Sequence, residues 1–451
     1  MKVLETPHSV ARLLEVVGEE RLAAVLAHSR PVVEGRYLHW DNLRHRRPPA
    51  GLSAHEWWLG IRLSRAGVAE EMPLVDKGGA PFSLVHIPSI RRRLHDIDQK
   101  LGRAGQPSDV QAMVDTHGRR YLLTNSLIEE AIRSSQLEGA STTRAKAKDM
   151  IREGRRPRDK SERMILNNFA AMERIEELAD RALTGEAVFE LHCILVDGTL
   201  DDAAKAGTYR TGDDKVVVEL IHSIETAHVP PPAGELPGRM ERLLAFANGT
   251  TPEDWLHPVL RSIILHFMVG FDHPFVDGNG RVARALFYWC LLHHGYSLAR
   301  FLSISRVLRE APATYARAYL HTETDGGDLT YFVDHQLDVL GRSIAALSAH
   351  ISRKVSETEA LEAEVRARHD LNHRQVELLE HAIRNPGFEY TVRSHETLHR
   401  VVTNTARADL VDLAAKGILV KSKRGRAHVF IAPRDIKERL NRPFHPPAAR
   451  G

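Results

Sequence analysis

The middle of the chain, about residues 111–350, has the hydrophobic spacing of a helical domain. Before residue 270, apolar side chains recur every three or four positions, at Val259, Ile263, Ile264 and Phe267. This spacing places them on one face of a helix. Residues 285–292 are apolar nearly all round, which predicts a central helix packed on every side. We therefore expect a mainly α-helical core.

The flanking patterns divide the rest of the chain. One short β signal, 216–229 followed by three prolines, predicts a small hairpin within the helical core. In the N-terminal region we expect Trp40, Trp57 and Trp58 to anchor the hydrophobic core. We find no catalytic or ligand-binding motif in this region. The expected divisions are an N-terminal region 1–110, a helical core 111–350, a helical linker 351–368, a C-terminal domain 369–440 and a disordered tail 441–451.

The C-terminal domain shows a pattern of three helices followed by two strands. The expected helices are Gln375–Ile383, a second with Ser394 as its N-cap that runs to about Arg400, and a third containing Thr405–Leu413. The expected strands are Ile418–Val420 and His428–Ile431, joined by a basic turn over residues 421–426. This order predicts a separate small α+β domain.

Composition and charge exclude several classes of protein. The 451 residues are 43% hydrophobic and 27% charged with a formal net charge of +3, which disfavours a protein that coats nucleic acid uniformly. The two cysteines, Cys193 and Cys290, lie in apolar surroundings, so we expect buried free thiols in an intracellular protein. No signal peptide or membrane-spanning run is evident, so we expect a cytoplasmic protein without a membrane partner.

The most specific stretch is 273–284, which combines an imidazole, a carboxylate, a two-glycine turn and two arginines. Gly278 and Gly280 allow the backbone to approach a ligand closely. The turn leads into a helix whose first N–H groups lack intrahelical partners and favour an anion. Asn279 adds a side-chain amide donor to this end of the helix.

The charged members of the stretch extend this picture. Arg281 and Arg284 are three residues apart, so both can point to one side and bind phosphate oxygens. Asp277 offers the single carboxylate that Mg²⁺ takes beside phosphate oxygens and waters. His273, with an ordinary pKa near ~6.5, can accept a proton at neutral pH. The stretch therefore predicts a site for a metal-bound polyphosphate beside a nucleophile, and a solvated helix–loop–helix turn is the alternative.

This stretch resembles, at every position, the signature of Fic-domain proteins, His-Pro-Phe-x-Asp/Glu-Gly-Asn-Gly-Arg-x-x-Arg. Residues 207–210 resemble the family's Gly-x-Tyr-Arg segment, and the hairpin at 216–229 resembles its flap. The resemblance implies a helical Fic core. Its usual reaction transfers AMP from ATP to a Ser, Thr or Tyr hydroxyl of a protein and releases pyrophosphate.

The resemblance also implies a role for each residue of the motif. His273 would deprotonate the target hydroxyl, and Asp277 would hold Mg²⁺ or Mn²⁺. The nucleotide phosphates would be bound by Gly278, Asn279, Gly280, Arg281 and Arg284, the last at the γ-phosphate. The flap would hold the target segment by pairing with its edge strand, as other proteins bind extended peptides.

Residues 134–139 resemble the inhibitory motif of the Fic class whose inhibitory helix precedes the core, Ser/Thr-x-x-x-Glu-Gly/Asn. Ser134, Glu138 and Gly139 match it. By this resemblance, Glu138 would pair with Arg284 and occupy the site of the γ-phosphate. An unrelated acidic helix end is the alternative. In some members the same glutamate supports removal of AMP by positioning a water, so deAMPylation is a second activity that the resemblance allows.

The C-terminal domain resembles a winged helix-turn-helix. Such domains place a recognition helix in the major groove of DNA and basic loops on its phosphates. The resemblance assigns the outward-facing residues Asn404 and Arg407 to the recognition helix, and Lys423, Arg424 and Arg426 to the wing. The alternative is that the domain mediates dimerisation or other protein contacts and its charges are solvated.

Two classes of function follow from these resemblances. The first is an autoinhibited protein adenylyltransferase that uses ATP and Mg²⁺ on an unidentified target protein or on itself. The second is a transcriptional regulator whose Fic core only senses a nucleotide. His273 favours the first, because a pure sensor would not need a base. A Fic transferase of another group, such as UMP, phosphocholine or phosphate, is a third possibility.

Overall fold

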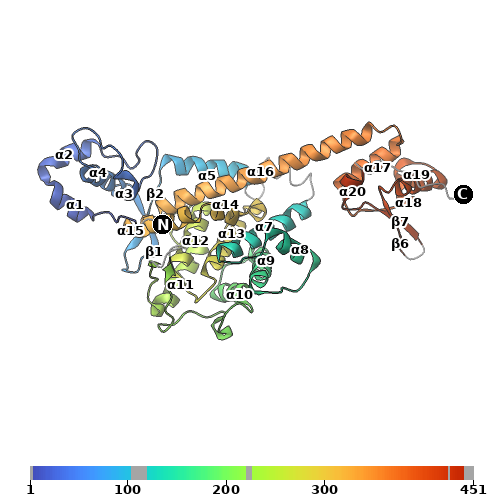
Figure 1. Ribbon diagram of the computed structural model, residues 1–451. Helices are drawn as coiled ribbons and strands as arrows, with labels where there is room; N and C mark the ends of the chain where they lie inside the picture. The colour runs from blue at the N-terminus through green and yellow to red at the C-terminus, as the bar shows by residue number, and fades with distance from the viewer. Residues whose placement is uncertain (1–3, 103–118, 220–225, 425–426, 441–451) are drawn as a thin grey trace. The chain divides into compact units, whose positions relative to one another are not determined.

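The computed structural model describes residues 4–102, 119–219, 226–424 and 427–440 (Figure 1). These residues belong to two compact units, the first within 1–111 and 122–347 and the second within 112–121 and 348–451. Helices dominate both units, which confirms the expected mainly α-helical class. Within the described ranges, none of the helices combines the length and apolar character needed to cross a bilayer.

The first unit contains the N-terminal region and the helical core. The N-terminal elements are α1 (Val10–Val17), α2 (Glu19–Ala27), α3 (Trp40–Leu43), α4 (Ala54–Ala66), β1 (Ala69–Val75), β2 (Pro81–Val85) and α5 (Pro88–Leu101). The core elements are α7 (Arg119–Leu137), α8 (Arg144–Glu153), α9 (Lys160–Leu178), α10 (Gly185–Val196), β3 (Val218–Glu219), β4 (Thr226–His228), α11 (Leu236–Ala247), α12 (Pro258–Asp272), α13 (Asn279–His293), α14 (Ile304–Glu310), α15 (Pro312–Thr324) and the first part of α16 (Thr330–Arg366).

Helices α12 and α13 form the centre of this unit. All residues of α13 from Arg281 to Leu292 are buried, which confirms the central helix expected from its apolar sequence. Helix α12 begins at the predicted segment, where the His257 side chain caps it by accepting a hydrogen bond from the backbone N–H of Val259. The loop between the two helices is the conspicuous stretch 273–278, so the core itself presents this loop.

The N-terminal region contains a β-hairpin that the sequence pattern did not reveal. Strands β1 and β2 pair antiparallel, with Ala69 opposite Val85. Pro73 interrupts the alternation within β1, and proline is tolerated there because this strand lies at an edge. The three tryptophans of the region, Trp40, Trp57 and Trp58, are buried, as expected of core anchors.

A second short hairpin lies within the helical core. Strands β3 and β4 pair antiparallel, with Val218 opposite His228 and Glu219 opposite Thr226. The described strands are shorter than the predicted span 216–229, whose residues 220–225 lie outside the described ranges. The hairpin leads into three prolines and then into α11.

The second unit has its own core and sheet. After α16 come α17 (His373–Arg384), β5 (Glu389–Thr391), α18 (Val392–His399), α19 (Thr403–Ala415), β6 (Val420–Arg424), β7 (Ala427–Ile431) and α20 (Ile436–Leu440). The three strands form an antiparallel sheet in the order β5-β7-β6. A buried apolar cluster that includes Leu379, Leu410 and Phe430 fills the space between helices and sheet.

Three local expectations were wrong. Thr391, not Ser394, caps α18, because its hydroxyl accepts the N–H of Ser394 at 3.0 Å. Lys423 and Arg424 belong to strand β6 rather than to a turn. Cys193 is exposed although Cys290 is buried, and both thiols are free. Arg426 and the tail after residue 440 lie outside the described residues.

Candidate active site

The loop between α12 and α13 holds His273 in a conformation suited to proton acceptance. His273 ends α12 in the left-handed region, with φ of 47°. Its Nδ1 lies 3.2 Å from the carbonyl oxygen of Gly270, so Nδ1 carries a proton and donates it there. Burial lowers the pKa of His273 to about 4, which keeps the ring neutral near pH 7. Nε2 is then the nitrogen that can accept a proton.

Two residues shape the turn that follows. Gly278 adopts φ of 85° directly before α13, a conformation that favours glycine. Both ends of the Asn279 amide bind the backbone of Phe275, accepting from its N–H at 2.9 Å and donating to its carbonyl at 2.8 Å. The Asn279 side chain therefore closes the loop, where we expected it to face a ligand.

Asp277 supplies the carboxylate of this loop, and its side chain is open to a ligand. Its side chain is 49% exposed, and Oδ2 lies 3.4 Å from an Nη atom of Arg281. Among the described residues, no three His, Cys, Asp or Glu side chains gather as a metal cluster. A divalent ion at Asp277 would therefore take its other ligands from phosphate oxygens and waters, which is how proteins commonly bind Mg²⁺.

The two arginines of the stretch differ in their surroundings. Arg281 is buried, and one Nη atom donates to the carbonyl of Leu195 at 2.8 Å. Its Nε has no hydrogen-bond partner among the described residues. We expected Arg281 to reach the phosphates, and here its fork mainly fastens α10 to the loop. That Nε is itself buried, so the fork of Arg281 does not face solvent in this structure.

Arg284 is held by the end of α7. Its Nε donates to the Ser134 hydroxyl at 2.9 Å, and one Nη atom donates to the Ser134 carbonyl at 3.1 Å and to Glu138 at 2.7 Å. A Cβ atom on Gly280 would overlap the same Glu138 carboxylate. The structure thus brings Ser134, Glu138 and Arg284 together over the N-terminus of α13. Gly139 follows with φ of 94° and ends the helical path.

A family model described as the Fic/DOC family matches residues 182–291, from before α10 to near the end of α13. This segment includes the whole loop. The chain therefore contains a Fic domain.

Curated relatives and a solved structure are similar to parts of the chain. The protein adenylyltransferases Fic of Drosophila grimshawi and Drosophila virilis are 39% and 41% identical to the chain over 69 residues. That match spans 15% of this chain and only 14% of each relative. The crystal structure of a Fic family protein from Desulfovibrio desulfuricans G20 covers 77% of this chain and 96% of its own, with a TM-score of 0.51 and 22% identity, which supports the fold alone.

Sequence reasoning missed His192, which supports the Fic loop from α10. Its Nδ1 accepts the N–H of Gly207 at 3.0 Å, and its Nε2 donates to the carbonyl of Asp277 at 3.0 Å. The ring stacks on Phe275 with centroids 3.8 Å apart. Burial lowers the pKa of His192 to about 4, so the ring is neutral and can accept at one nitrogen while donating at the other. A lone histidine in an apolar helix carried no signal of this role.

Glu130, also missed, anchors α7 to the Fic core. It is buried and accepts hydrogen bonds from the Ser303 hydroxyl at 2.9 Å and from both the backbone N–H and the hydroxyl of Ser305. Burial raises the pKa of Glu130. It lies about two turns before the end of α7, and Glu138 directly follows that end, so this anchor sets the position of Glu138.

The residues predicted to contact DNA lie in the other unit. Asn404 and Arg407 are exposed on α19, and Lys423 and Arg424 are exposed on β6. Arg424 pairs with Glu389 of β5 at 2.9 Å. Their contact with DNA stays a prediction.

Proposed function

We propose that this protein is an autoinhibited protein adenylyltransferase, which transfers AMP from ATP to a Ser, Thr or Tyr hydroxyl of a target protein or of itself. The observation that carries the proposal is the position of His273. His273 ends α12 with its Nε2 not engaged in the bond to Gly270, and the loop that follows carries Asp277 and leads into the N-terminus of α13. The names of the curated relatives support AMP as the transferred group.

In the proposed reaction, the neutral ring of His273 takes the proton of the target hydroxyl. The hydroxyl oxygen attacks the α-phosphorus of ATP, and the bond to the bridging oxygen breaks as pyrophosphate leaves. The free N–H groups at the start of α13, beside Gly280, bind the charge that develops on the phosphate oxygens. Asp277 would hold Mg²⁺, which neutralises charge on the phosphates when bound.

The proposed inhibition acts through Arg284. Its Nε and one Nη atom are held by Ser134 and Glu138, so these donors are not open to a γ-phosphate. The Glu138 carboxylate also places negative charge where the phosphates should bind. Release of Glu138 frees both the arginine and the space. The same carboxylate, facing the phosphate site, is suited to orient a water for the removal of AMP.

The proposed target site is the hairpin β3–β4. A two-stranded hairpin offers an open edge to which an extended peptide can add as a further strand. His228 ends the described hairpin within contact of the carbonyl of Phe271, two residues before His273. A peptide paired with this hairpin would carry its hydroxyl close to the base.

The test compares Glu138→Gly with the unchanged protein on ATP labelled at the α-phosphate, with and without a cell lysate. We expect Glu138→Gly to increase label on itself and on lysate proteins by ten-fold or more. The matched control is Glu153→Gly, which removes an exposed acidic residue from the end of α8 without touching Arg284. Equal labelling in the two variants would remove Glu138 from its proposed role. Parallel incubations with UTP and with γ-labelled ATP identify the donor and the transferred group.

A second candidate function is nucleotide-sensing regulation through DNA. The favouring observation is the α18–α19 surface of the second unit, an open groove lined by Arg393, Arg400 and Arg407 beside the exposed Asn404. Helix-turn-helix proteins read DNA with such a helix, and arginines there bind phosphates or guanine. The proposal predicts gel retardation of the gene's own upstream DNA, abolished when Lys423, Arg424 and Arg426 are all changed to Ala. Absence of retardation at low salt would favour dimerisation or another protein contact.

A further inference from the structure

His228, at the end of strand β4, joins the β3–β4 hairpin to α12, the helix that ends at His273. Its Nε2 lies 2.7 Å from the carbonyl oxygen of Phe271, and its Nδ1 lies 2.6 Å from Glu323 of α15. The ring is 6% exposed and packs against the ring of Phe271. One buried side chain therefore fixes the strand relative to the residue two positions before His273.

Both ring nitrogens of His228 face acceptors. The carbonyl of Phe271 can only accept, so Nε2 must donate to it. Nδ1 and the Glu323 carboxylate are both acceptors when unprotonated, so the hydrogen bond between them needs a second proton on one of the two side chains. Glu323 is thus required for the second bond, and its own position decides where the His228 ring lies.

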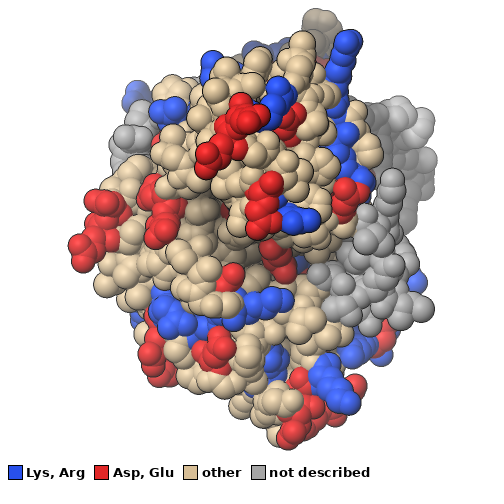
Figure 2. Space-filling model, turned by 90° about the vertical axis from the view of Figure 1, so that its left-hand side faces the viewer, with Lys and Arg blue, Asp and Glu red and all other residues tan. Residues whose placement is uncertain are grey.

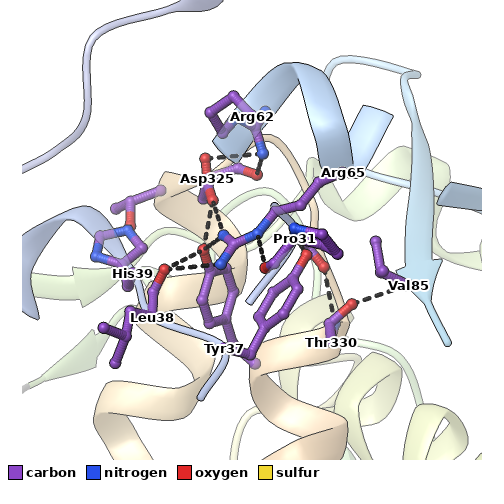
Figure 3. Close-up of polar contacts among 12 residues, drawn as sticks. Pro31, Tyr37, Leu38, His39, Arg62, Arg65, Val85, Asp325 and Thr330 are labelled. Carbon is purple, nitrogen blue, oxygen red and sulfur yellow. Dashed lines mark hydrogen bonds and ion pairs between the residues drawn. The ribbon is translucent and has the colours of Figure 1, made fainter. Parts of the chain in front are cut away.

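Glu323 is the last but one residue of α15. The N-terminal region holds the segment that follows, and Figure 3 shows Asp325 and Thr330 of this segment beside their partners. The hydroxyl of Thr324 lies 3.2 Å from Nε2 of His39, and Asp325 forms an ion pair with Arg62 at 3.0 Å. Strand β2 continues the contact, since the N–H of Val85 donates to the hydroxyl of Thr330 at 2.8 Å. Residues 324–330 are therefore bound to three separate parts of the N-terminal region.

Arg65 is the centre of this buried network (Figure 3). Its guanidinium donates to the Tyr331 hydroxyl at 2.6 Å and to the backbone carbonyls of Pro31 and Leu38 at 3.0 Å each. It also lies 3.6 Å above the ring of Tyr37. Buried donors with this many partners hold one arrangement, because each lost bond would leave a polar group unsatisfied.

Two hydroxyls complete the network around the segment. Tyr331 donates to Asp325 at 2.6 Å, and Tyr37 donates to Asp328 at 2.5 Å. Asp328 in turn accepts the N–H of Thr330 at 3.0 Å, at the start of α16. Both ends of the segment that follows Glu323 are therefore fixed by side chains from residues 37–65.

The hairpin β1–β2 reaches the same place independently. Phe82 packs edge-on against Phe271, with ring centroids 5.2 Å apart. Arg239 of α11 binds the carbonyl of Val75 at 2.9 Å and the carboxylate of Asp272 at 3.0 Å. The two residues that precede His273 are thus both in contact with, or bridged to, this N-terminal hairpin.

The face of the molecule shown in Figure 2 does not have the charge distribution of a surface that binds a polyanion. This view looks from the side where α1, α2 and α4 lie in Figure 1, and its basic and acidic side chains are interspersed. Arg21 pairs with Glu56 and Arg46 pairs with Glu34 in this region. Mixed, paired charges of this kind are not the footprint of a polyanion-binding surface.

We infer that His228 and Glu323 are positioning residues, which hold β4 at a set distance from His273, and that residues 31–85 fix the segment that follows Glu323. The N-terminal region would then determine where a target hydroxyl meets the base. This inference rests on the proposed transfer reaction and on the hairpin as its target site. It assigns a role to a region in which the sequence showed no chemistry.

The main test changes Glu323 in the active Glu138→Gly background of the full chain. We expect Glu323→Ala to lower AMP transfer to protein hydroxyls about ten-fold while the Kd for ATP stays unchanged. Glu323→Gln should keep at least half of the transfer, because its amide can donate to Nδ1 of a neutral His228 ring. The matched control Glu310→Ala, which breaks an exposed ion pair with Arg342, should leave transfer unchanged.

The link to the N-terminal region is tested with a milder change, Tyr37→Phe, which removes one hydroxyl and keeps the ring under Arg65. We expect a two- to three-fold loss of transfer by itself and no further loss when Glu323→Ala is already present. Such non-additivity identifies residues that act on one element. Losses that multiply would separate the N-terminal region from the His228–Glu323 pair.

Three results would overturn the inference. They are full transfer by Glu323→Ala, equal losses in Glu323→Ala and Glu323→Gln, and a loss explained by weaker ATP binding. An inactive Glu138→Gly parent would instead reject the proposed function. In that case amide hydrogen exchange tests whether Glu323 and His228 hold strand β4 in place. Exchange in residues 226–229 should be faster in Glu323→Ala and unchanged in Glu323→Gln and Glu310→Ala, and unaltered exchange in all three would reject it.

Discussion

The stretch 273–284, which is the loop and the first turn of α13, and the outer face of α19 both present arginine and asparagine side chains, but they do so in opposite ways. In that stretch, Asn279 and Arg284 are buried and the bonds they make are to particular groups of the protein. On α19, Asn404 and Arg407 are exposed to solvent. A buried polar group must find its partners within the fold, whereas an exposed one is satisfied by water.

This difference in burial decides how closely the structure restricts the function of each set of side chains. The loop has essentially one arrangement, so its geometry restricts the chemistry that can occur there. The α19 face is compatible with DNA, another protein or solvent alone. We therefore expect large effects from substitutions in the stretch 273–284 and small effects from substitutions on the α19 face. A large effect on the exposed face, or a small effect in the buried stretch, would weaken the contrast between them.

The largest expected effect is that of His273→Ala in the Glu138→Gly background. Loss of a general base typically costs 10²–10⁴-fold, and we expect a fall of about 10³-fold in AMP transfer. Equilibrium binding of ATP should remain within a factor of about two or three, because the ring does not hold the phosphates in the proposed reaction. Transfer that persists in this variant would take His273 out of its role and leave the loop as a binding site only.

The next effect is on pH dependence. Burial lowers the pKa of His273 to about 4, so the neutral base is present above that value and is lost as the pH falls through it. Transfer by Glu138→Gly should therefore remain near its neutral value at pH 5, where a histidine of ordinary pKa near ~6.5 would retain only about 3%. The measurement is the initial rate from pH 4 to 8 at saturating ATP. An acid limb near pH 6.5 would contradict the burial of the ring.

A smaller effect is expected on the exposed face. Changing Lys423 and Arg424 to Ala should weaken binding to double-stranded DNA about ten-fold at low salt, because two phosphate contacts are lost. AMP transfer should stay unchanged, since these residues belong to the other unit. Fluorescence anisotropy over a range of salt concentrations measures both the affinity and its salt slope. An unaltered slope would show that the face does not contact phosphates.

The smallest effect is on folding. Arg407→Ala should change the free energy of unfolding by no more than about 0.5 kcal/mol, as is usual for exposed positions. Its buried neighbour on α19, Asp409, binds Asn372 and Arg374, so Asp409→Ala should cost about 3 kcal/mol. Chemical denaturation followed by circular dichroism compares the two. Similar costs would mean that Arg407 has a structural partner and is not simply solvated.

The sequence predicted the elements well where one apolar pattern ran through a whole helix. Helix α13 is the clearest case, since its all-round apolar surface can only be buried. The hairpin β1–β2 escaped prediction because Pro73 breaks its alternation. The cap of α18 was misplaced because Thr391 and Ser394 both suit a cap, and only the bond between them decides.

The candidate site shows the same division. The spacing of His273, Asp277 and Arg284 predicts a phosphate site, because its chemistry needs those residue types close together in the chain, and their roles stay a prediction. Arg281 and Asn279 lie in the same motif, but their side chains mostly bind the protein, which spacing cannot reveal. His192 and Glu130 act from other helices, so only the fold shows that they reach the loop and α7.

The sequence by itself determined the helical class of the core and the composition of its loop, because both depend on residues near one another in the chain. The tertiary structure decided which distant side chains meet. It placed Glu323 on His228, and it brought Ser134 and Glu138 onto Arg284, a pairing that only the resemblance to an inhibitory motif had suggested. Such contacts join residues far apart in sequence. They depend on how the helices pack, and no local pattern records that packing.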